Sequence, residues 1–514
     1  DIQQGKLAYC YLLSAMSVLA ERKDFIRRLF HSKKVSPTCC YSVWLCDSGE
    51  WKNIIIDDYI PCIQNGNSYK PYFSKSKSDD IWVMLLEKAF AKLFGNYYNI
   101  DGGFQSEALN ALTGAPAKYF QAKKNDIPEI EQLWMFITGS LQNKFIVTAS
   151  SRGESVLLNK SNGIVLNHAY SILDAREVQL ANGRKERLIM MRNPWGNHEW
   201  RGDWSDESPL WTPEMRKQLN YYPKDDGIFW INLSDFDHHF EAVCRCHVHD
   251  DFFFSFIKLG DERKKQDYFA TTMTVEKDGY VYVSAQQKLK KHFRNNLDYE
   301  YSYARMIVCE VNSSGKIVRF INGKYKRKQS IVIKGYFTKG IYLVFLEVDW
   351  VQNYYNSINV NAYSKVQVDF KEVSPGKFSI TGFYQDVLKA YLAKGDPNIK
   401  AKSYDSEGQH FKVEKIKGDK MGLVGIHFLN KEKNVTLFSK FTMKKLENIK
   451  VYIPENVTSN IVEISVPPMS ERVLLLKAKV LAVEVSLYAY EYTEGYRLIN
   501  NYTEEELKTL CRAL

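Results

Sequence analysis

Three side chains of complementary chemistry, Cys10, His168 and Asn193, occur in that order and far apart along this chain. A cysteine thiolate is a nucleophile and an imidazole is a base. The side-chain carbonyl of an asparagine accepts a hydrogen bond from one ring nitrogen and holds the other in place. The trio therefore predicts a fold that brings distant segments together, with the nucleophile and the base on separate lobes. Its chemistry indicates cysteine-dependent hydrolysis of peptide bonds.

The residues around Cys10 indicate how the thiol is activated. Apolar side chains recur at helical spacing over 10–30, so Cys10 stands at the N-terminal end of a predicted helix, where the pKa of a thiol falls. Gly5 permits a close approach of the backbone, and Gln4 with the Cys10 backbone N–H forms the predicted oxyanion hole. The competing interpretations are a buried structural cysteine and, for His168, a histidine packed in an apolar core segment.

The spacing of apolar residues changes along the first half of the chain. Helical spacing returns over 80–94, and the pair Gly102-Gly103 marks a turn. The short apolar runs at 145–149 and 188–191 are typical of buried strands. We therefore expect the first quarter to be mostly helical and the next quarter mostly β.

The second half has a different texture. After residue 247, alternating or apolar stretches separated by turns predict all-β sandwiches. A linker is predicted near 374–376, and more strands are expected beyond it, including one at 483–487. A capping-box pattern predicts a short helix over 503–514.

The number and spacing of the cysteines indicate a reducing compartment. Nine cysteines, an odd number without framework-like spacing, indicate reduced thiols and a cytoplasmic protein. No apolar run approaches the ~20 residues needed to span a bilayer, and the polar start does not resemble a signal peptide. The chain does not begin with Met and its best motif starts almost at once, so we expect an N-terminal segment to be missing.

The net charge of +10 is concentrated in two basic clusters, 288–294 and 324–328. One interpretation is that these lysines and arginines are solvated edges and loops of the β region. A second is a binding surface for anionic lipid headgroups, which would make the protein membrane-associated. No nucleic-acid motif accompanies the charge, so we expect no nucleic-acid partner. The oligomeric state stays open.

Taken together, the motifs of residues 1–246 resemble those of the calpain family of papain-type cysteine proteases. The matching segments are Gln4-Gly5-x-Leu7-x-x-Cys10-x-Leu12-Leu13, Trp82-x-x-Leu85-Leu86-Glu87-Lys88-Ala89-Phe90-Ala91-Lys92-Leu93, Gly102-Gly103, Leu112-Thr113-Gly114, His168-Ala169-Tyr170-Ser171, Arg192-Asn193-Pro194-Trp195-Gly196-x-x-Glu199-Trp200-x-Gly202-x-Trp204-Ser205-Asp206 and Asp226-Gly227-x-Phe229-Trp230.

The resemblance implies an α+β fold, with a papain-like two-lobed calpain protease core followed by two all-β C2-like sandwich domains. The expected domains are a mostly helical lobe at 1–122, a β-rich lobe at 123–246, a C2-like sandwich at 247–372 and a second C2-like domain at 373–514. No acidic, glycine-containing EF-hand loop is present in the sequence. The chain is therefore identified as an atypical member without the penta-EF-hand domain.

The resemblance also implies a calcium cofactor, with one ion in each lobe. Asp1 and Glu107 match side-chain ligands of the first site, and carboxylates are the hard oxygen ligands that calcium favours. The matching ligands of the second site are Glu199, Asp206 and Asp226. Trp195 matches a movable wedge beside the active site. The competing interpretation of the five carboxylates is solvated side chains or ion pairs.

Several residues depart from the family pattern. Ala8 and Tyr9 stand where Gly-Asp usually precedes the cysteine, and Tyr11 stands where a tryptophan usually follows it. Asn167 replaces the glycine that commonly precedes the histidine, and Ile228 occupies an often acidic position of the second calcium site. These changes leave the catalytic groups in place and bear on calcium affinity and substrate fit.

The leading hypothesis is a calcium-regulated intracellular cysteine endopeptidase that cuts protein substrates at limited sites through an acyl-thioester. The alternative is a catalytically weak calpain-like scaffold that binds calcium, membrane or partner proteins, a reading that the altered residues beside Cys10 favour. A third reaction, transglutaminase-like acyl transfer, usually has Asp where Asn193 stands.

Overall fold

The computed structural model divides the chain into two compact units. The first contains Asp1–Phe256, Val281–Tyr299 and Asn359–Lys365, and the second contains Ile257–Tyr280, Glu300–Ile358 and Val366–Leu514. The described residues are 2–5, 9–76, 80–121, 127–154, 156–180, 182–261, 265–294, 299–322, 326–351, 356–374, 378–393, 411–418, 423–433, 435–447, 449–452, 461–478 and 489–500.

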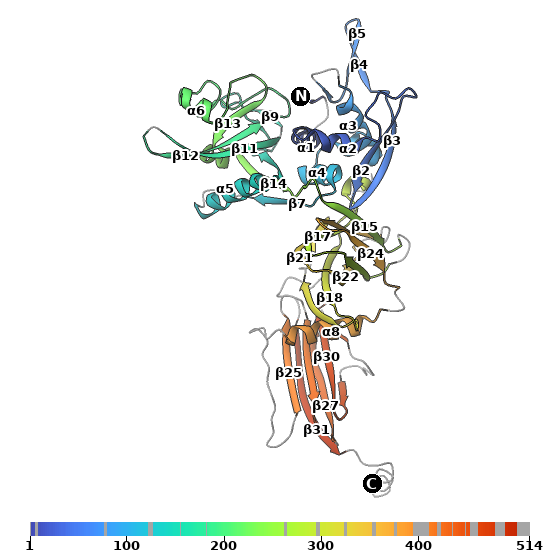
Figure 1. The fold of residues 1–514 in the computed structure, drawn as a ribbon. Coiled ribbons are helices and arrows are strands. Elements are labelled where there is room, and N and C mark those ends of the chain that lie inside the picture. The colour runs from blue at the N-terminus through green and yellow to red at the C-terminus, as the bar shows by residue number, and fades with distance from the viewer. Residues whose placement is uncertain are drawn as a thin grey trace. The chain divides into compact units, whose positions relative to one another are not determined.

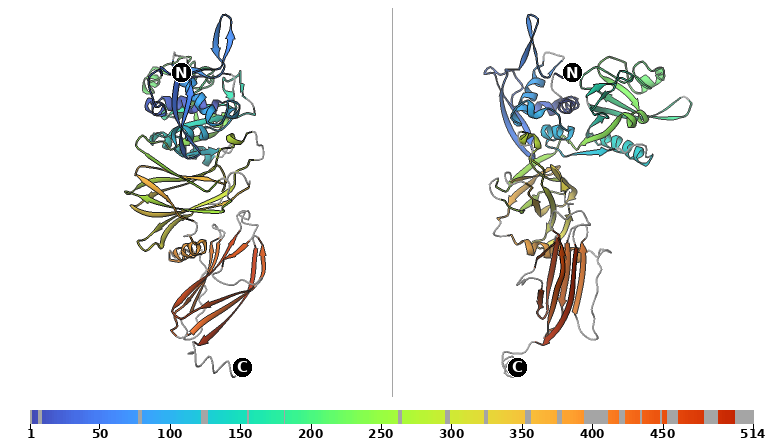
Figure 2. Two further views of the ribbon diagram at one scale, coloured as in Figure 1. Left: turned by 90° about the vertical axis from the view of Figure 1, so that its right-hand side faces the viewer. Right: turned by 180° about the vertical axis from the view of Figure 1, so that it is seen from behind.

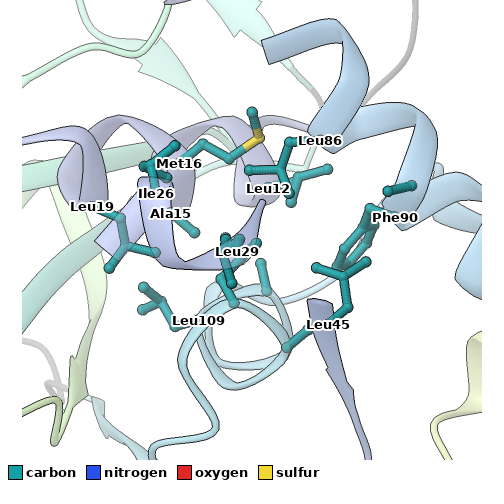
Figure 3. Packing of buried hydrophobic residues seen from close by; sticks show 14 of the residues in the cluster. Leu12, Ala15, Met16, Leu19, Ile26, Leu29, Leu45, Leu86, Phe90 and Leu109 are labelled. Carbon is teal, nitrogen blue, oxygen red and sulfur yellow. The ribbon is translucent and has the colours of Figure 1, made fainter. Parts of the chain in front are cut away.

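The first unit begins with a lobe built around α1, which Figure 1 shows beside α2, α3 and α4. Apolar side chains of these helices and of β2 form one buried cluster, seen from close by in Figure 3. Leu12 and Phe90, from α1 and α3, are completely buried there. The elements of this lobe are β1 (Ile2–Gln3), α1 (Cys10–Ala20), α2 (Lys23–Leu29), β2 (Cys40–Asp47), β3 (Glu50–Asp57), β4 (Cys62–Asn65), β5 (Ser68–Pro71), β6 (Lys75–Ser76), α3 (Trp82–Leu93), η1 (Tyr98–Ile100) and α4 (Gln105–Thr113).

Two details of this lobe differ from the sequence prediction. The helix expected over 10–30 is divided into α1 and α2, because Arg22 has φ −111° and ψ 82°, outside the helical region. The lobe also contains two antiparallel hairpins, β2–β3 and β4–β5, that helical spacing did not indicate. Figure 2 shows the β4–β5 hairpin extending away from the helices. The helix predicted over 80–94 is confirmed as α3.

The second lobe of the first unit is a six-stranded antiparallel sheet in the order β13-β12-β11-β8-β14-β7. The runs at 145–149 and 188–191 lie in or against β8 and β12, as predicted. The helix α5 was not expected. The elements of this lobe are β7 (Ala117–Gln121), α5 (Ile127–Gln142), β8 (Ile146–Ser151), β9 (Leu157–Leu158), β10 (Val165–Leu166), β11 (Ala169–Gln179), β12 (Lys185–Arg192), α6 (Pro213–Gln218), β13 (Ile228–Asn232), α7 (Leu233–His239) and β14 (Phe240–Cys246).

The rest of the chain is rich in strands, as its sequence predicts. One antiparallel sheet of the second unit has the order β19-β18-β22-β16-β24. Two further sheets follow, β25-β26-β30-β28 and β29-β27-β31. The elements are β15 (Phe253–Leu259), β16 (Tyr268–Val275), β17 (Gly279–Gln286), η2 (Lys290–Phe293), β18 (Tyr303–Val311), β19 (Ile317–Asn322), β20 (Lys326–Arg327), β21 (Ser330–Phe337), β22 (Gly340–Asp349), β23 (Ile358–Ser364), β24 (Val368–Glu372), α8 (Ile380–Ala393), β25 (Phe411–Gly418), β26 (Leu423–Asn430), β27 (Val435–Glu447), β28 (Ile449–Tyr452), β29 (Ile461–Val466), β30 (Ser470–Ala478) and β31 (Ala489–Asn500).

The all-β prediction for the second half was wrong at α8. Phe383, Tyr384, Val387 and Leu388 recur at helical spacing and are buried against the strands of this unit. The strand predicted at 483–487 and the helix predicted at 503–514 lie outside the described residues. Within the described part of the chain, no helix combines the length and the apolar character needed to cross a bilayer.

Candidate active site

Cys10 is the first residue of α1, at the end where the helix dipole favours negative charge. The Tyr9 carbonyl accepts a hydrogen bond from the Leu12 backbone N–H at 2.9 Å, which fixes the first turn. Burial raises the pKa of the Cys10 thiol, and the backbone amides of Ala169 and Tyr11 oppose that shift. The thiol is therefore protonated at neutral pH in this conformation.

His168 and Asn193 are brought together by β11 and β12, two neighbouring strands of the second lobe. His168 directly precedes β11, Asn193 directly follows β12, and His168 Nε2 lies 2.9 Å from Asn193 Oδ1. Both residues are buried. The predicted base and the residue predicted to orient it are thus paired at the ends of two neighbouring strands.

The amide of Asn193 sets the tautomer of the imidazole. Its Nδ2 atom donates to the carbonyl oxygens of Asn197 and His198, at 2.8 and 3.0 Å. The oxygen Oδ1 must therefore face the ring, so His168 carries its proton on Nε2 and presents the lone pair of Nδ1. Among the described residues, this buried Nδ1 has no hydrogen-bond partner, Cys10 included. Burial lowers the pKa of His168 to about 4, although the bond to Asn193 opposes the shift, so the ring is neutral at pH 7 and Nδ1 is unprotonated.

The backbone of His168 is held by a residue that sequence reasoning missed. Ser151 Oγ, at the end of β8, accepts from the His168 backbone N–H at 2.9 Å and donates to the Val165 carbonyl at 2.7 Å. The preceding Asn167 has φ 45°, in the left-handed region that asparagine tolerates better than most residues. The asparagine in place of glycine therefore preserves the approach of the chain to His168.

Trp195 lies between the predicted oxyanion donor and the base. Its indole Nε1–H donates to Gln4 Oε1 at 2.7 Å, and its ring centre is 4.7 Å from that of His168. A cavity of about 270 Å³ opens beside this contact, lined by Gln3, Gln4, Gly5, Trp195, Asn197 and His198. The structure thus brings together Gln4, Trp195, His168 and Asn193, while the thiol of Cys10 makes no hydrogen bond to the base within the described structure.

A family model described as "Calpain family cysteine protease" matches residues 1–247. Residues 1–247 therefore belong to the calpain family. The calpain-type cysteine protease DEK1 of Zea mays is 38% identical over 258 residues, a match that covers 48% of this chain and 11% of the maize protein. Human calpain-9 is 34% identical over 260 residues, covering 49% of this chain and 36% of that protein.

The human calpain-2 catalytic subunit is 32% identical over 263 residues and is likewise matched over 36% of its length. The chain therefore spans little more than a third of these relatives at most. Among solved structures, the cysteine protease and lectin-like domains of Cwp84, a surface layer associated protein of Clostridium difficile, align with a TM-score of 0.21 and 12% identity, over 75% of this chain and 82% of that chain. That similarity is too weak to inform the fold.

The three calpain-like carboxylates of the second lobe lie near one another. Glu199 Oε1 accepts from the backbone N–H groups of Asp226 and Gly227, at 3.0 and 2.6 Å, and Asp206 Oδ2 accepts from Lys224 N at 2.9 Å. Burial raises the pKa of Glu199 to about 7, and the charge of Asp206 adds to the shift. Their donor chemistry and mutual repulsion fit a hard cation. Across the described residues, however, no three His, Cys, Asp or Glu side chains converge as a finished metal cage.

The predicted calcium site of the first lobe has two side-chain ligands, Asp1 and Glu107. Asp1 lies outside the described residues. Glu107 Oε2 already faces the ammonium group of Lys291, 3.5 Å away, and the same ammonium donates to the Gly102 carbonyl. A positively charged side chain thus stands where the calpain resemblance implies a metal ion.

Glu87 supports the oxyanion segment and was missed as a functional residue. This buried α3 carboxylate accepts from the Ser74 hydroxyl at 2.5 Å and from the Ser74 backbone N–H at 3.2 Å. The adjacent Phe73 carbonyl packs so tightly on Gly5 that a Cβ there would lie 2.2 Å from its oxygen. Glu87 therefore fixes the wall against which Gly5, the neighbour of Gln4, is seated.

Proposed function

We propose that the chain is a calpain-type cysteine endopeptidase that cleaves proteins at limited sites. The observation that carries this proposal is the state of His168. Its Nε2 is bound to Asn193, and its Nδ1 is buried and without a hydrogen-bond partner in the described structure. A core histidine with only a structural role would satisfy both ring nitrogens. An unpaired basic nitrogen beside the strand that contacts α1 is suited to take the proton of Cys10.

In the proposed reaction, Cys10 Sγ transfers its proton to His168 Nδ1 and the thiolate attacks the scissile carbonyl carbon. The Gln4 side-chain amide and the Cys10 backbone N–H stabilise the oxyanion. The C–N bond then breaks, and His168 returns its proton to the leaving amine. Water, deprotonated by His168, hydrolyses the acyl-thioester and releases Cys10. Asn193 keeps the imidazole oriented throughout.

The conformation described here supports a resting state. The Trp195 ring lies between Gln4 and His168, and the hydrogen bond to its indole engages the Gln4 side chain. Cys10 and His168 are both neutral, so no thiolate is preformed. Activation in this proposal requires the indole to leave and the thiol to approach Nδ1.

Calcium regulation is part of the proposal, and it rests on the second lobe. Glu199, Asp206 and Asp226 would hold the ion, which would supply positive charge to carboxylates that otherwise repel each other. Glu199 binds the amides of the Asp226-Gly227 turn, and the Gly227 carbonyl accepts from the Asn193 backbone N–H at 2.8 Å. The same turn therefore links the carboxylates to the residue that orients the base.

The decisive experiment compares the purified 514-residue chain with its Cys10→Ala variant on an unstructured protein such as casein, with calcium and with chelator. Calcium-stimulated cleavage by the wild type and none by the variant would support a regulated protease. Equal signals from the two proteins would reject the protease and leave the scaffold hypothesis, which calcium-binding measurements on the same samples would then test.

The setting and partners are also proposals. We expect protein substrates and a cytoplasmic location, which the eight described cysteines support because all are free thiols. We retain the C2-like assignment of the β-rich half as a prediction. The exposed Lys326, Arg327 and Lys328 are the described part of the second basic cluster and are suited to anionic lipid headgroups. Lys288, Lys291 and His292 of the first cluster are engaged with the first lobe instead.

A further inference from the structure

Lys291 lies in η2, within the first compact unit, and its side chain is inserted into the first lobe. Its ammonium group donates to the Gly102 carbonyl and lies 3.5 Å from Glu107 Oε2. Only 9% of the side chain is exposed. A Cβ at Gly103 would lie 2.4 Å from Lys291 Nζ, so the glycine leaves the space that the ammonium occupies. A long lysine side chain is thus ordered at one defined point of a loop.

The same ammonium also contacts the helix of the nucleophile. Lys291 Nζ lies 4.6 Å from the ring centre of Tyr11, the residue directly after Cys10. The Tyr11 hydroxyl donates to the Ile100 carbonyl at 3.0 Å, which ties the ring to the loop on its other side. A cation over an aromatic face is stabilised by the ring quadrupole. Tyr11 and Lys291 therefore form one arrangement that joins α1 to the 100–107 segment.

The rest of the 288–294 segment holds Lys291 in place. Asp47, at the end of β2, is completely buried and pairs with Lys288, with His292 at 2.8 Å and with Lys52 at 2.8 Å. Burial alone would raise the pKa of Asp47, but His292 and Lys288 outweigh it and hold this pKa well below its usual range. The segment is thus fastened to the first lobe on both sides of Lys291.

A carbonyl oxygen, a carboxylate and an aromatic face form a binding site for a cation, and here the cation belongs to the chain. Calcium takes six to eight oxygen ligands and needs carboxylates whose charge is not already compensated. With Lys291 in place, the charge of Glu107 is balanced and the Gly102 carbonyl is used. An ion bound by these oxygens would have to displace the ammonium, so the first lobe does not fit the calcium site that the family implies.

We propose that Lys291 is a positioning residue, a tethered cation that holds the 100–107 segment, from the end of η1 to the first turn of α4, against the first turn of the nucleophile helix in place of a metal ion. This role of Lys291 deepens the proposed function, because calcium would then act through the second lobe alone. The relevance of Lys291 to catalysis rests on that proposed function. The replacement of an ion by the Lys291 ammonium group can be tested whether or not the chain hydrolyses peptide bonds.

The test measures hydrogen exchange by mass spectrometry in the full chain carrying Cys10→Ala, so that cleavage plays no part. In chelator, Lys291→Met should speed exchange over 98–107 and in α1 by about 10- to 100-fold, the effect of losing a charge-assisted hydrogen bond. Millimolar calcium should restore protection in this variant, since the vacated oxygens can accept an ion. Lys291→Arg, which keeps the charge, should recover part of the protection without calcium.

Two controls separate this role from simple packing. Lys290→Met, at the exposed neighbouring lysine of the same 3-10 helix, should exchange like the wild type. Glu107→Gln should speed exchange, and calcium should not restore it. Unchanged exchange in Lys291→Met, or no restoration by calcium, would overturn the proposal. Should Lys291→Met fail to fold, the wild type alone tests the proposal. Calcium must leave hydrogen exchange over its residues 98–107 unchanged, and added protection there would overturn the proposal.

Discussion

The indole N–H of Trp195 donates to the side-chain oxygen of Gln4 across 2.7 Å, joining the second lobe to the segment that carries the predicted oxyanion donor. The bond holds the indole beside His168, whose ring centre is 4.7 Å away. One hydrogen bond thus holds an aromatic ring between the predicted oxyanion donor and the predicted base. Removing only the donor is the sharpest test of its importance.

Trp195→Phe keeps an aromatic ring and deletes the N–H. Because a net hydrogen bond contributes about 1 kcal/mol, we expect the calcium-free rate of casein cleavage to rise about fivefold. Alkylation of Cys10 by iodoacetamide, followed by mass spectrometry, should accelerate in parallel. Trp44→Phe, at an exposed tryptophan of β2, is the control. An unchanged or slower calcium-free rate would show that the indole bond does not restrain the site.

Gly5→Ala should impair catalysis more than binding. The added Cβ would meet the Phe73 carbonyl oxygen at 2.2 Å, so the backbone beside Gln4 must shift. Displacing one oxyanion donor lowers kcat by about 10²- to 10³-fold, and we expect a loss at the lower end with little change in KM. Gly139→Ala, in α5 with open space around it, is the matched control. A change in KM without a change in kcat would contradict the assignment of Gln4 to the oxyanion hole.

Ser151→Ala should loosen the base. The substitution leaves the buried His168 backbone N–H without its acceptor, at a cost of about 1–3 kcal/mol. We expect a lower urea midpoint and a reduced kcat, with Ser161→Ala, at an exposed loop serine, as the control. Ser151→Thr retains the hydroxyl and should recover activity. Equal kcat in wild type and Ser151→Ala would assign the serine to packing only.

Glu87→Gln should change how stability depends on pH. Burial raises the pKa of Glu87 to about 7 from an ordinary value of 4.5. Below pH 4.5 both states hold the proton. Between 4.5 and 7 the unfolded chain loses it first, so the stability of the wild type falls. Above pH 7 the loss in the free energy of unfolding caused by ionising buried Glu87 stays constant at about 3 kcal/mol.

The glutamine variant cannot ionise, so its stability should lack this decline. Urea denaturation of both proteins at several pH values between 4 and 8 measures the difference, and it should grow as pH rises and level off above 7. Glu241→Gln, at an exposed residue of β14, supplies the baseline. A constant difference across this range would mean that Glu87 titrates normally in the folded protein.

Glu199→Gln tests the second-lobe calcium proposal. The amide oxygen can still accept from the backbone of Asp226 and Gly227, so the turn should persist while one negative charge is lost. We expect the calcium concentration for half-maximal cleavage to rise on the order of tenfold, because ligand charge tunes calcium affinity. Glu207→Gln, at the exposed neighbour of Asp206, should respond as the wild type does. Identical calcium curves for all three proteins would contradict the assignment.

Residue types and local spacing were enough to predict that His168 and Asn193 lie together, while the catalytic roles of these residues and of Cys10 stay predictions. Each is marked by its own chemistry and by an adjoining helix start or strand end, so the pairing of His168 with Asn193 follows from two neighbouring strands. Asn167 looked like a departure in the sequence. Its φ of 45° shows that the backbone requirement is preserved, which spacing alone does not reveal.

The supporting residues could not be predicted because their signals are not local. Ser151 is an ordinary strand serine until β8 meets the turn before β11. Lys291 reads as part of a solvated basic cluster until the fold places it over Tyr11, a long way along the chain. Such contacts depend on which loop packs on which lobe, information that no periodicity carries. The unexpected α8 has a different cause, because its apolar residues have helical spacing within a region dominated by strand-like patterns.

The ion cluster around Asp47 limits how the protease core can be used as a module. The family match ends at residue 247, yet two of the side chains that contact this buried carboxylate, Lys288 and His292, come from beyond that boundary. Of the lysines that pair with Asp47 in the described structure, a truncated chain that stops at the boundary would keep Lys52 and lose Lys288, and an under-compensated buried charge is strongly destabilising. The segment matched by the family model, residues 1–247, is therefore shorter than the compact unit that includes residues 281–299. Expression of an isolated core, or its transfer to another protein, would have to carry the 281–299 segment with it.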